Sequence, residues 1–279
     1  MHRLPEPSID AETVYGASHS RIRLPSLKQR HVDETPNILD AAQRFSDAAR
    51  ADEVHLLKNT DFETASVSAD EMKKLYGKGV QRRSAPGRPH YDELMSAAPH
   101  GRCPYCGERR VGSIDHYLPK STFSSLAVAP VNMVPACSEC NHAKGSYRPS
   151  ASKPAILHPY FDDIDRFRWL YATVEAAVPP AIGYEARGSA ITDVLMRDRV
   201  ERHFTMFKLA ELYRSHAGQV VDELDRRLLP VFKAGGEDAI RSYLEEEIAL
   251  RSVGPQNTWL GALYEALAES DWYCSKNFL

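Results

Sequence analysis

The sequence predicts an α+β fold that is mainly α-helical, with one central β-β-α unit and one separate β-hairpin. Two regions, before residue 98 and after residue 191, carry apolar residues at helical spacing. A third region has strand-like runs on either side of Pro179-Pro180, as the two strands of a hairpin do. Between the helical regions, two pairs of cysteines enclose a strand-like segment and the start of a short helix. We therefore expect helical regions before and after a small central unit of two strands and one helix.

The chain has 279 residues, enough for one large domain or two small ones. Its apolar periodicity and its content of proline, glycine and charged residues change along the sequence, and these changes predict five segments. They are an irregular N-terminal arm over 1–35, a helical N-terminal region with a basic loop over 36–98, a core over 99–150, a β-hairpin region over 151–190 and a C-terminal helical bundle over 191–279.

Prolines, caps and apolar spacing define the N-terminal segments. Residues 1–35 lack periodicity and contain three prolines, which predicts an arm that is either disordered or docked on the body or a partner. Pro36 is expected to open a helix whose apolar residues repeat from Ile38 to Ala49. The further expected features are a capping box at Ser68 and Glu71, a helix stop at Gly77, a mobile basic loop over 78–88 and a helix from Pro89 to about Ala97.

The C-terminal half predicts a hairpin followed by helices. Runs 167–174 and 181–186 are the expected strands, and we expect this hairpin to pack beside the central unit. From about Thr192, four apolar stripes predict helices that break at Gly218, Gly235-Gly236 and Gly254-Pro255. The run Glu245-Glu246-Glu247 gives these helices an acidic outer face, which is either solvated or a protein-binding surface.

The composition, 43% hydrophobic and 26% charged, is that of an ordinary soluble protein. No apolar run approaches the roughly 18–20 residues that span a bilayer, and the first residues lack the apolar core of a signal peptide. We therefore expect a cytoplasmic protein without a membrane segment.

The charge is unevenly distributed along the chain. Residues 73–148 contain twelve Lys and Arg against five Asp and Glu, a net of +7, so that the remaining residues carry −10 and the whole chain −3. The weakly acidic total argues against a nucleic-acid binder, which is usually basic overall. The basic segment nevertheless predicts one surface for phosphate and another for a different partner.

Cys103 and Cys106 form one CxxC pair, and Cys137 and Cys140 form a second. In a reducing compartment this spacing indicates a metal site rather than disulfides. Two such turns complete the tetrahedral set of four thiolates that structural zinc prefers, with no position left for water. We therefore expect structural Zn²⁺, with unrelated buried thiols or a redox pair as alternatives. Cys274 stands apart and is expected to be an ordinary buried or free thiol.

The segment between the cysteine pairs, with the helix start after it, contains residues suited to phosphodiester hydrolysis. Asp115 and Asn141 offer oxygen ligands that suit Mg²⁺ or Mn²⁺. His116 can take a proton from water, and Lys144 can neutralise a phosphate. Asn132 lies in the expected opposing strand region. A lone histidine is often structural or solvated, so the combination of these residues, and no single one, carries the prediction.

This segment, 103–145, resembles the zinc-knuckle branch of the HNH, or ββα-metal, nucleases. The matching motifs are CPYC, DHYLPKS, an asparagine sixteen residues after the histidine, and CSECNHAKG. The resemblance implies that His116 is the general base and that Asn132 fixes the hairpin turn and orients His116. It also implies that Asp115 and Asn141 hold the catalytic Mg²⁺ or Mn²⁺.

The resemblance also implies a reaction and a context. The expected reaction is hydrolysis of DNA, double-stranded in our expectation, to 5′-phosphate and 3′-hydroxyl products, with Lys144 at the backbone or the scissile phosphate. The sequence contains no recognisable helix-turn-helix, further zinc finger or basic recognition helix, so specificity is weak or comes from a partner.

The arrangement is similar to the stand-alone HNH subunits of prokaryotic anti-phage defence systems such as the Septu type. That similarity implies an ATPase subunit as partner, and an oligomer is also compatible. The alternatives are a zinc-stabilised binding module for nucleic acid or protein, an RNase of the same fold, and a restriction-type or mobile-element nuclease.

Overall fold

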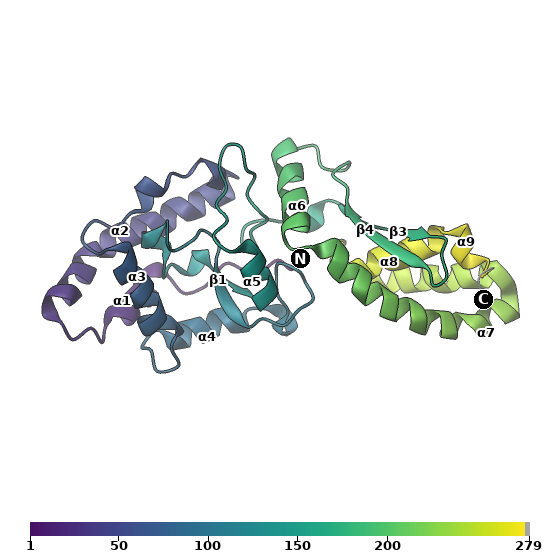
Figure 1. Cartoon of the computed structure of the whole chain (residues 1–279), viewed down its shortest axis with the longest axis horizontal. Coiled ribbons are helices and arrows are strands. Elements are labelled where there is room, and N and C mark those ends of the chain that lie inside the picture. Colours follow the sequence, from purple (N-terminus) through teal and green to yellow (C-terminus); the bar gives the residue numbers. More distant parts are fainter. Residues whose placement is uncertain (277–279) are drawn as a thin grey trace. The chain divides into compact units, whose positions relative to one another are not determined.

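The computed structural model describes residues 1–276, which divide into a first unit, residues 1–162, and a second unit that begins at Asp163. Both units are mainly helical and each contains one small antiparallel sheet, which confirms the predicted α+β class (Figure 1). The boundary falls inside the segment 151–190, which the sequence predicted as one region. None of the described helices is both long enough and apolar enough to cross a membrane.

Residues 1–35 fold largely into helices, so the predicted irregular arm is wrong. α1 (Ala11–His19) begins after Asp10, whose side chain caps the first turn. α2 (Pro25–Arg50) has its proline in the first turn, where the missing N–H costs nothing. α1 is short and weakly periodic, and it is stabilised by packing of fully buried side chains such as Tyr15.

The first residues of the chain lie against the body of unit 1. His2 donates its backbone N–H to the Pro104 carbonyl (2.8 Å), and Leu4 donates to the Pro159 carbonyl (2.9 Å). Leu4 is buried. This stretch therefore docks on the turn that contains the first cysteine pair, which is the second of the two alternatives for the arm.

α2 runs without a break through Pro36, where the prediction placed its start. A proline inside a helix removes one backbone hydrogen bond and costs roughly 3 kcal/mol. Tertiary contacts on the preceding turn offset this cost, because the buried Glu34 carboxylate accepts hydrogen bonds from the N–H groups of Ala65 (3.0 Å) and Ser66 (2.7 Å). These contacts connect residues that are distant in sequence, so local patterns do not reveal them.

α3 (Ala69–Leu75) begins with the predicted capping box, in which Ser68 and Glu71 each satisfy a backbone N–H of the other. The helix does not stop at Gly77. It continues as a π-helical turn, which carries the chain toward the β-β-α unit.

The basic stretch before the core is mostly helical. The π-helical turn covers Tyr76–Gln81, and α4 (Arg88–Ser96) follows with Pro89 in its first turn, as predicted. The predicted loop over 78–88 is therefore reduced to residues 82–87.

The predicted β-β-α unit is present. β1 (Ser113–His116) pairs antiparallel with β2 (Met133–Ala136), with His116 opposite Met133, and α5 (Ser138–Lys144) follows. Apolar side chains of the two strands share a buried core with the N-terminal helices and the π-helical turn, which includes Val14, Ile38, Tyr76, Val80, Leu94, Ile114 and Met133. The N-terminal helices and the β-β-α unit therefore form one folded body.

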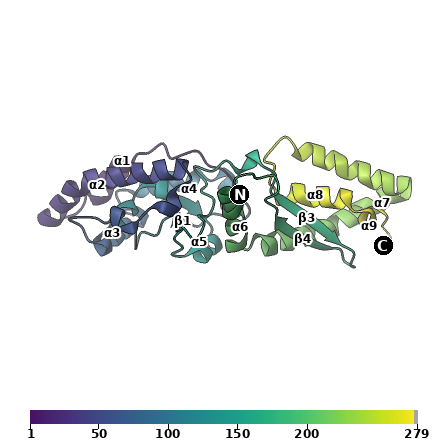
Figure 2. The same cartoon turned by 90° about the horizontal axis from the view of Figure 1, so that it is seen from above.

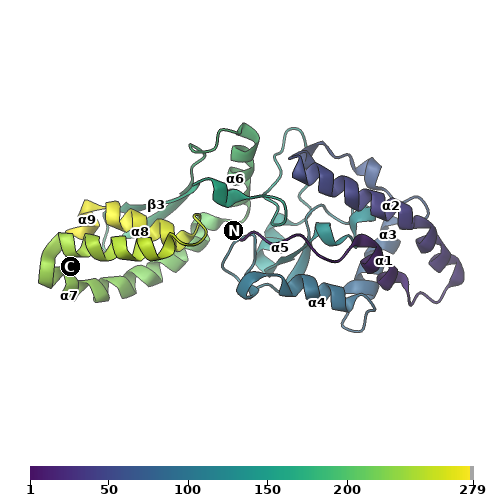
Figure 3. The same cartoon turned by 180° about the vertical axis from the view of Figure 1, so that it is seen from behind.

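Unit 2 contains the predicted hairpin, in which β3 (Leu170–Glu175) pairs antiparallel with β4 (Ala181–Ala186). The hairpin packs on α7 (Leu209–Arg251) and α8 (Trp259–Glu269), as Figures 2 and 3 show. The hairpin belongs to unit 2 and the β-β-α unit to unit 1, and the expectation that the hairpin packs beside the β-β-α unit stays a prediction. The alternation of apolar and polar residues along the hairpin strands shows that one face is buried, but not which element covers that face.

The described residues after 191 are mainly helical, and their helices have fewer breaks than expected. α7 passes through Gly218 because the flanking Ala217 and Val221 are buried in the bundle. It changes direction at Gly236 (φ 65°, ψ −151°), a conformation that glycine adopts without strain, as the predicted break requires. The described part of unit 2 also contains the α-helices α6 (Val194–Met206) and α9 (Asp271–Cys274).

Candidate active site

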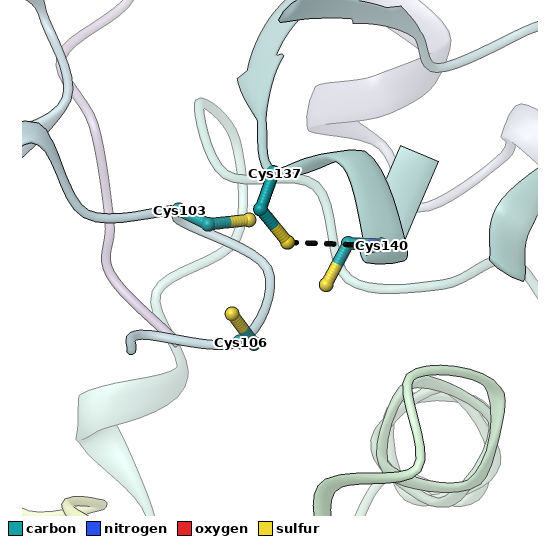
Figure 4. A group of neighbouring side chains, drawn as sticks. All are labelled: Cys103, Cys106, Cys137 and Cys140. Carbon is teal, nitrogen blue, oxygen red and sulfur yellow. Dashed lines mark hydrogen bonds between the residues drawn. The ribbon is translucent and has the colours of Figure 1, made fainter. Parts of the chain in front are cut away.

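Four buried thiols form a compact cluster beside the β-β-α unit, with their side chains directed toward one another (Figure 4). Cys103 and Cys106 lie on the turn before β1, whereas Cys137 caps α5 and Cys140 lies in its first turn. The four sulfur atoms lie within 4.8 Å of one another. A tetrahedral site with Zn–S bonds of about 2.3 Å separates its sulfurs by about 3.8 Å. The cluster therefore fits one four-coordinate zinc ion after small side-chain movements.

Local backbone geometry shapes both turns of the cluster. Gly107, at φ 77°, closes the first turn. The Arg109 N–H points at Cys106 Sγ (3.4 Å), and the Cys140 N–H points at Cys137 Sγ (3.3 Å, dashed in Figure 4). Backbone N–H groups directed at sulfur favour the thiolate form that binds metal.

The Asp115 carboxylate is buried, and each of its oxygen atoms has a partner. Oδ2 accepts a hydrogen bond from the Tyr105 hydroxyl (2.8 Å), and Oδ1 accepts one from the Lys144 ammonium (3.1 Å). Lys144 also donates to the His116 carbonyl (2.7 Å). Lys144 is therefore a buried cation in contact with the strand that carries Asp115.

The His116 ring is held in one orientation. Its Nε2 lies 2.8 Å from the Ala127 carbonyl oxygen, and since a carbonyl can only accept, Nε2 carries the proton and Nδ1 carries the lone pair. Burial, with a smaller contribution from the charge of Lys120, lowers the pKa of His116 to about 3. The imidazole is thus neutral at neutral pH, and Nδ1 lies 3.4 Å from the Lys120 ammonium.

Asn132 is fully buried and ties together the loop between the two strands. Its Nδ2 donates to the carbonyls of Leu118 (3.0 Å) and Leu126 (3.2 Å), and its Oδ1 accepts from the Leu118 N–H (2.7 Å). Leu126 precedes Ala127, whose carbonyl is bonded to His116. Asn132 therefore fixes the backbone that sets the orientation of the imidazole.

Asn141, on α5, lies at the same cavity as Asp115 and His116. Its Nδ2 donates to the Ser113 hydroxyl (2.8 Å), which leaves Oδ1 as the atom that can bind a cation. Asp115, His116 and Asn141 line one cavity of about 440 Å³. The two other predicted site residues, Asn132 and Lys144, are buried behind this lining.

Two residues that the sequence analysis did not assign line the same cavity. Lys120 follows His116 by four residues, and Tyr76 comes from the π-helical turn. The Tyr76 ring packs edge-on against His116, with ring centres 4.5 Å apart. The position of Lys120 inside the DHYLPKS motif is a signal that identifies it, whereas no local pattern places Tyr76 beside His116.

Comparison with known proteins agrees with this geometry. Residues 103–147 match the model of the HNH endonuclease family. Over 97% of its length the chain is 24% identical to protein ea31 of Escherichia phage lambda, and the match covers 98% of that protein. Over 42% of its length it is 26% identical to Septu protein PtuB of Bacillus thuringiensis, and covers 44% of that protein. No solved structure matches the chain significantly.

The family match and the structure coincide in one segment. This segment contains the cysteine cluster, both strands and helix of the β-β-α unit, and the residues Asp115, His116, Asn132 and Asn141. Residues 103–147 therefore form an HNH endonuclease domain, and the chain that carries it is an endonuclease.

Proposed function

We propose that the chain hydrolyses phosphodiester bonds of DNA, with His116 as general base and one divalent cation bound by Asp115 and Asn141. The orientation of His116 carries the proposal. Its Nε2 is bonded to the Ala127 carbonyl, so Nδ1 is the acceptor at the cavity that Asp115 and Asn141 also line. A general base needs its lone pair on the side of the water that attacks the phosphate, so that it can accept the proton of that water.

Mg²⁺ or Mn²⁺ fits the ligands at this cavity. Asp115 and Asn141 offer oxygen atoms, which these cations prefer, whereas zinc fits the separate cluster of four thiols. Both oxygens of Asp115 already accept one hydrogen bond, but each carboxylate oxygen has a second acceptor position. When bound, the cation would stabilise negative charge on the phosphate and on the leaving oxygen.

The neighbouring residues act by positioning these groups. In this proposal His116 accepts the proton of water at Nδ1, while Asn132 holds the loop whose Ala127 carbonyl fixes the ring. Tyr105 and Lys144 each donate a hydrogen bond to one oxygen of the Asp115 carboxylate. In this proposal, Lys144 therefore positions Asp115 rather than contacting the substrate. Attack by the activated water would leave a 5′-phosphate and a 3′-hydroxyl.

Plasmid and tRNA cleavage test the proposal. Each substrate is incubated with the purified chain and Mg²⁺ or Mn²⁺, with and without candidate partner proteins. We expect nicked and linear plasmid, intact tRNA and no cleavage in EDTA. Cleavage of tRNA alone would favour an RNase of the same fold. No cleavage of either substrate under any of these conditions would favour a zinc-stabilised binding module.

We further propose that the nuclease is a subunit of a prokaryotic defence complex. The partial similarity to a Septu protein supports this context, and the full-length similarity to a phage protein supports the alternative, a nuclease of a mobile element. Purification of the tagged chain from native lysate distinguishes the two. Stoichiometric recovery of an ATPase subunit supports the complex, and recovery of the chain alone or as a homo-oligomer supports the alternative.

Asn141→Ala should raise the Mg²⁺ concentration needed for half-maximal cleavage roughly tenfold or more, because it removes one of two proposed protein ligands. A Mg²⁺ titration of plasmid cleavage measures this shift. His142→Ala, an exposed neighbour on the same helix, is the matched control and should keep the wild-type titration. Identical Mg²⁺ dependence of Asn141→Ala and wild type would remove Asn141 from the cation site.

A further inference from the structure

The cavity beside His116 has a wall that comes from outside the HNH domain. Lys73 of α3 and Tyr76 of the π-helical turn line it together with Lys120. The first two residues precede the segment 103–147 that matches the HNH family. The helical N-terminal region therefore contributes side chains directly to the candidate active site.

Lys120 carries a positive charge that makes no ion pair within residues 1–276. Its side chain is partly buried, and its Nζ lies 3.4 Å from His116 Nδ1, a neutral acceptor, and 5.1 Å from the centre of the Tyr76 ring. No carboxylate of the described chain lies within ion-pair distance of it. Burial lowers the pKa of the Lys120 ammonium. An ammonium that loses hydration without a counter-ion is unfavourable, and an anion at this place removes the penalty.

The carboxylates around this cavity already have cationic partners. Asp115 is paired with Lys144 (3.1 Å), and Asp70 is paired with Lys73 (3.1 Å). Asp115 attracts the Lys120 ammonium without forming an ion pair with it, and the like charges of Lys144 and Lys73 oppose this attraction. The side chains at the described part of the cavity thus have a surplus of one positive charge before any cation binds, and this charge attracts an anion such as a phosphodiester group.

Tyr76 fixes the position of this charge. It is 4% exposed, and its ring contacts His116 edge-on at 79° and faces the Lys120 ammonium. Within the described chain its hydroxyl is buried and makes no hydrogen bond, so the contacts of the ring account for its position. Tyr76 is the first residue of the π-helical turn, and π-helical turns are frequent at functional sites.

We propose that Lys120 binds a phosphate of the substrate strand and that Tyr76 is the residue that positions its ammonium. The inference rests on the proposed nuclease function. A phosphate oxygen is a charged acceptor and replaces the neutral Nδ1 of His116 as the partner of Lys120. Substrate binding then leaves Nδ1 available to water.

The salt dependence of DNA binding tests Lys120 without any cleavage. Fluorescence anisotropy of a labelled 20-base-pair duplex in EDTA is titrated at several KCl concentrations. Lys120→Gln should reduce the slope of log K against log salt by about one, because one phosphate contact is lost, and Lys120→Arg should keep the slope. Lys153→Gln, an exposed lysine outside the cavity, is the control and should behave as wild type. An unchanged slope in Lys120→Gln overturns the inference.

The positioning role of Tyr76 makes a separate prediction. Tyr76→Phe should retain the wild-type slope of log K against log salt, because the ring remains and the hydroxyl makes no hydrogen bond within residues 1–276. Tyr76→Leu should raise KM roughly tenfold and should reduce the slope of log K against log salt by about one, as Lys120→Gln does. Adding Tyr76→Leu to Lys120→Gln should reduce this slope no further. A further loss of slope in the double variant would mean that Tyr76 acts independently of Lys120. Circular dichroism and zinc content of each variant establish that it is folded.

The outcomes for this subsite and for the nuclease proposal are distinguishable. A wild-type chain that shows the Lys120-dependent slope but cuts neither plasmid nor tRNA keeps the phosphate subsite and rejects the nuclease proposal. A chain that cuts plasmid while Lys120→Gln keeps the wild-type slope and KM supports the nuclease proposal and rejects the phosphate subsite.

Discussion

His116→Ala should lower the rate of plasmid cleavage by about 10³-fold, within the range that a general base contributes. The ring has its Nε2 proton bonded to the Ala127 carbonyl and its Nδ1 lone pair at the cavity, and alanine removes that acceptor. Cleavage under single-turnover conditions, with Mg²⁺ at saturation, measures the chemical step. Zinc content should not change, because His116 lies outside the cysteine cluster.

Two further variants keep this prediction testable. His116 is buried against Tyr76, so alanine also leaves a cavity, whereas His116→Gln retains most of the volume and a donor for the Ala127 carbonyl. Both variants should be inactive, and only His116→Ala should lose stability. His142→Ala removes an exposed histidine nearby and should keep full activity. Cleavage by His116→Gln within a few-fold of wild type would exclude His116 as the base.

Cys103→Ser should lose zinc and unfold unit 1 together. Structural zinc bound by four thiolates contributes on the order of 10 kcal/mol, which is comparable to the whole stability of a domain. The cluster joins the turn before β1 to the start of α5, so its loss releases both ends of the segment that contains Asp115 and His116. Elemental analysis for zinc and thermal unfolding of the purified variant check the two effects.

Cys274→Ser is the matched control for this variant. Cys274 is equally buried but lies in unit 2, outside the cluster of four sulfurs. Its serine variant should retain zinc and lose only about 1–3 kcal/mol for a buried hydroxyl. A Cys103→Ser protein that is stable, free of zinc and active would contradict a structural role for the metal.

Features with a local signature were predictable from the sequence. The two cysteine pairs come together as expected, because each pair is a single turn and its spacing alone places two sulfurs side by side. The capping box at Ser68 and Glu71 and the paired strands of the β-β-α unit also follow from short-range patterns. The site roles of Asp115, His116 and Asn141 came from their motif, and the cavity that they share is compatible with them.

Features that depend on distant segments were missed. The helical course of α2 through Pro36 depends on Glu34 and the backbone of Ala65 and Ser66, and the hairpin of unit 2 is covered by α7 and α8. Apolar alternation and proline position report the conformation of a short segment, and they contain no information about the element that packs on it.

The same distinction applies to the site. The sequence by itself determined the cluster of four cysteines and the identity of the HNH segment, because these depend on residue type and spacing within 103–147. The tertiary structure decided that Lys144 is buried against Asp115, and that Tyr76 meets His116 and the ammonium of Lys120. These contacts join segments far apart in the chain, and only the packing of a complete core brings such segments together.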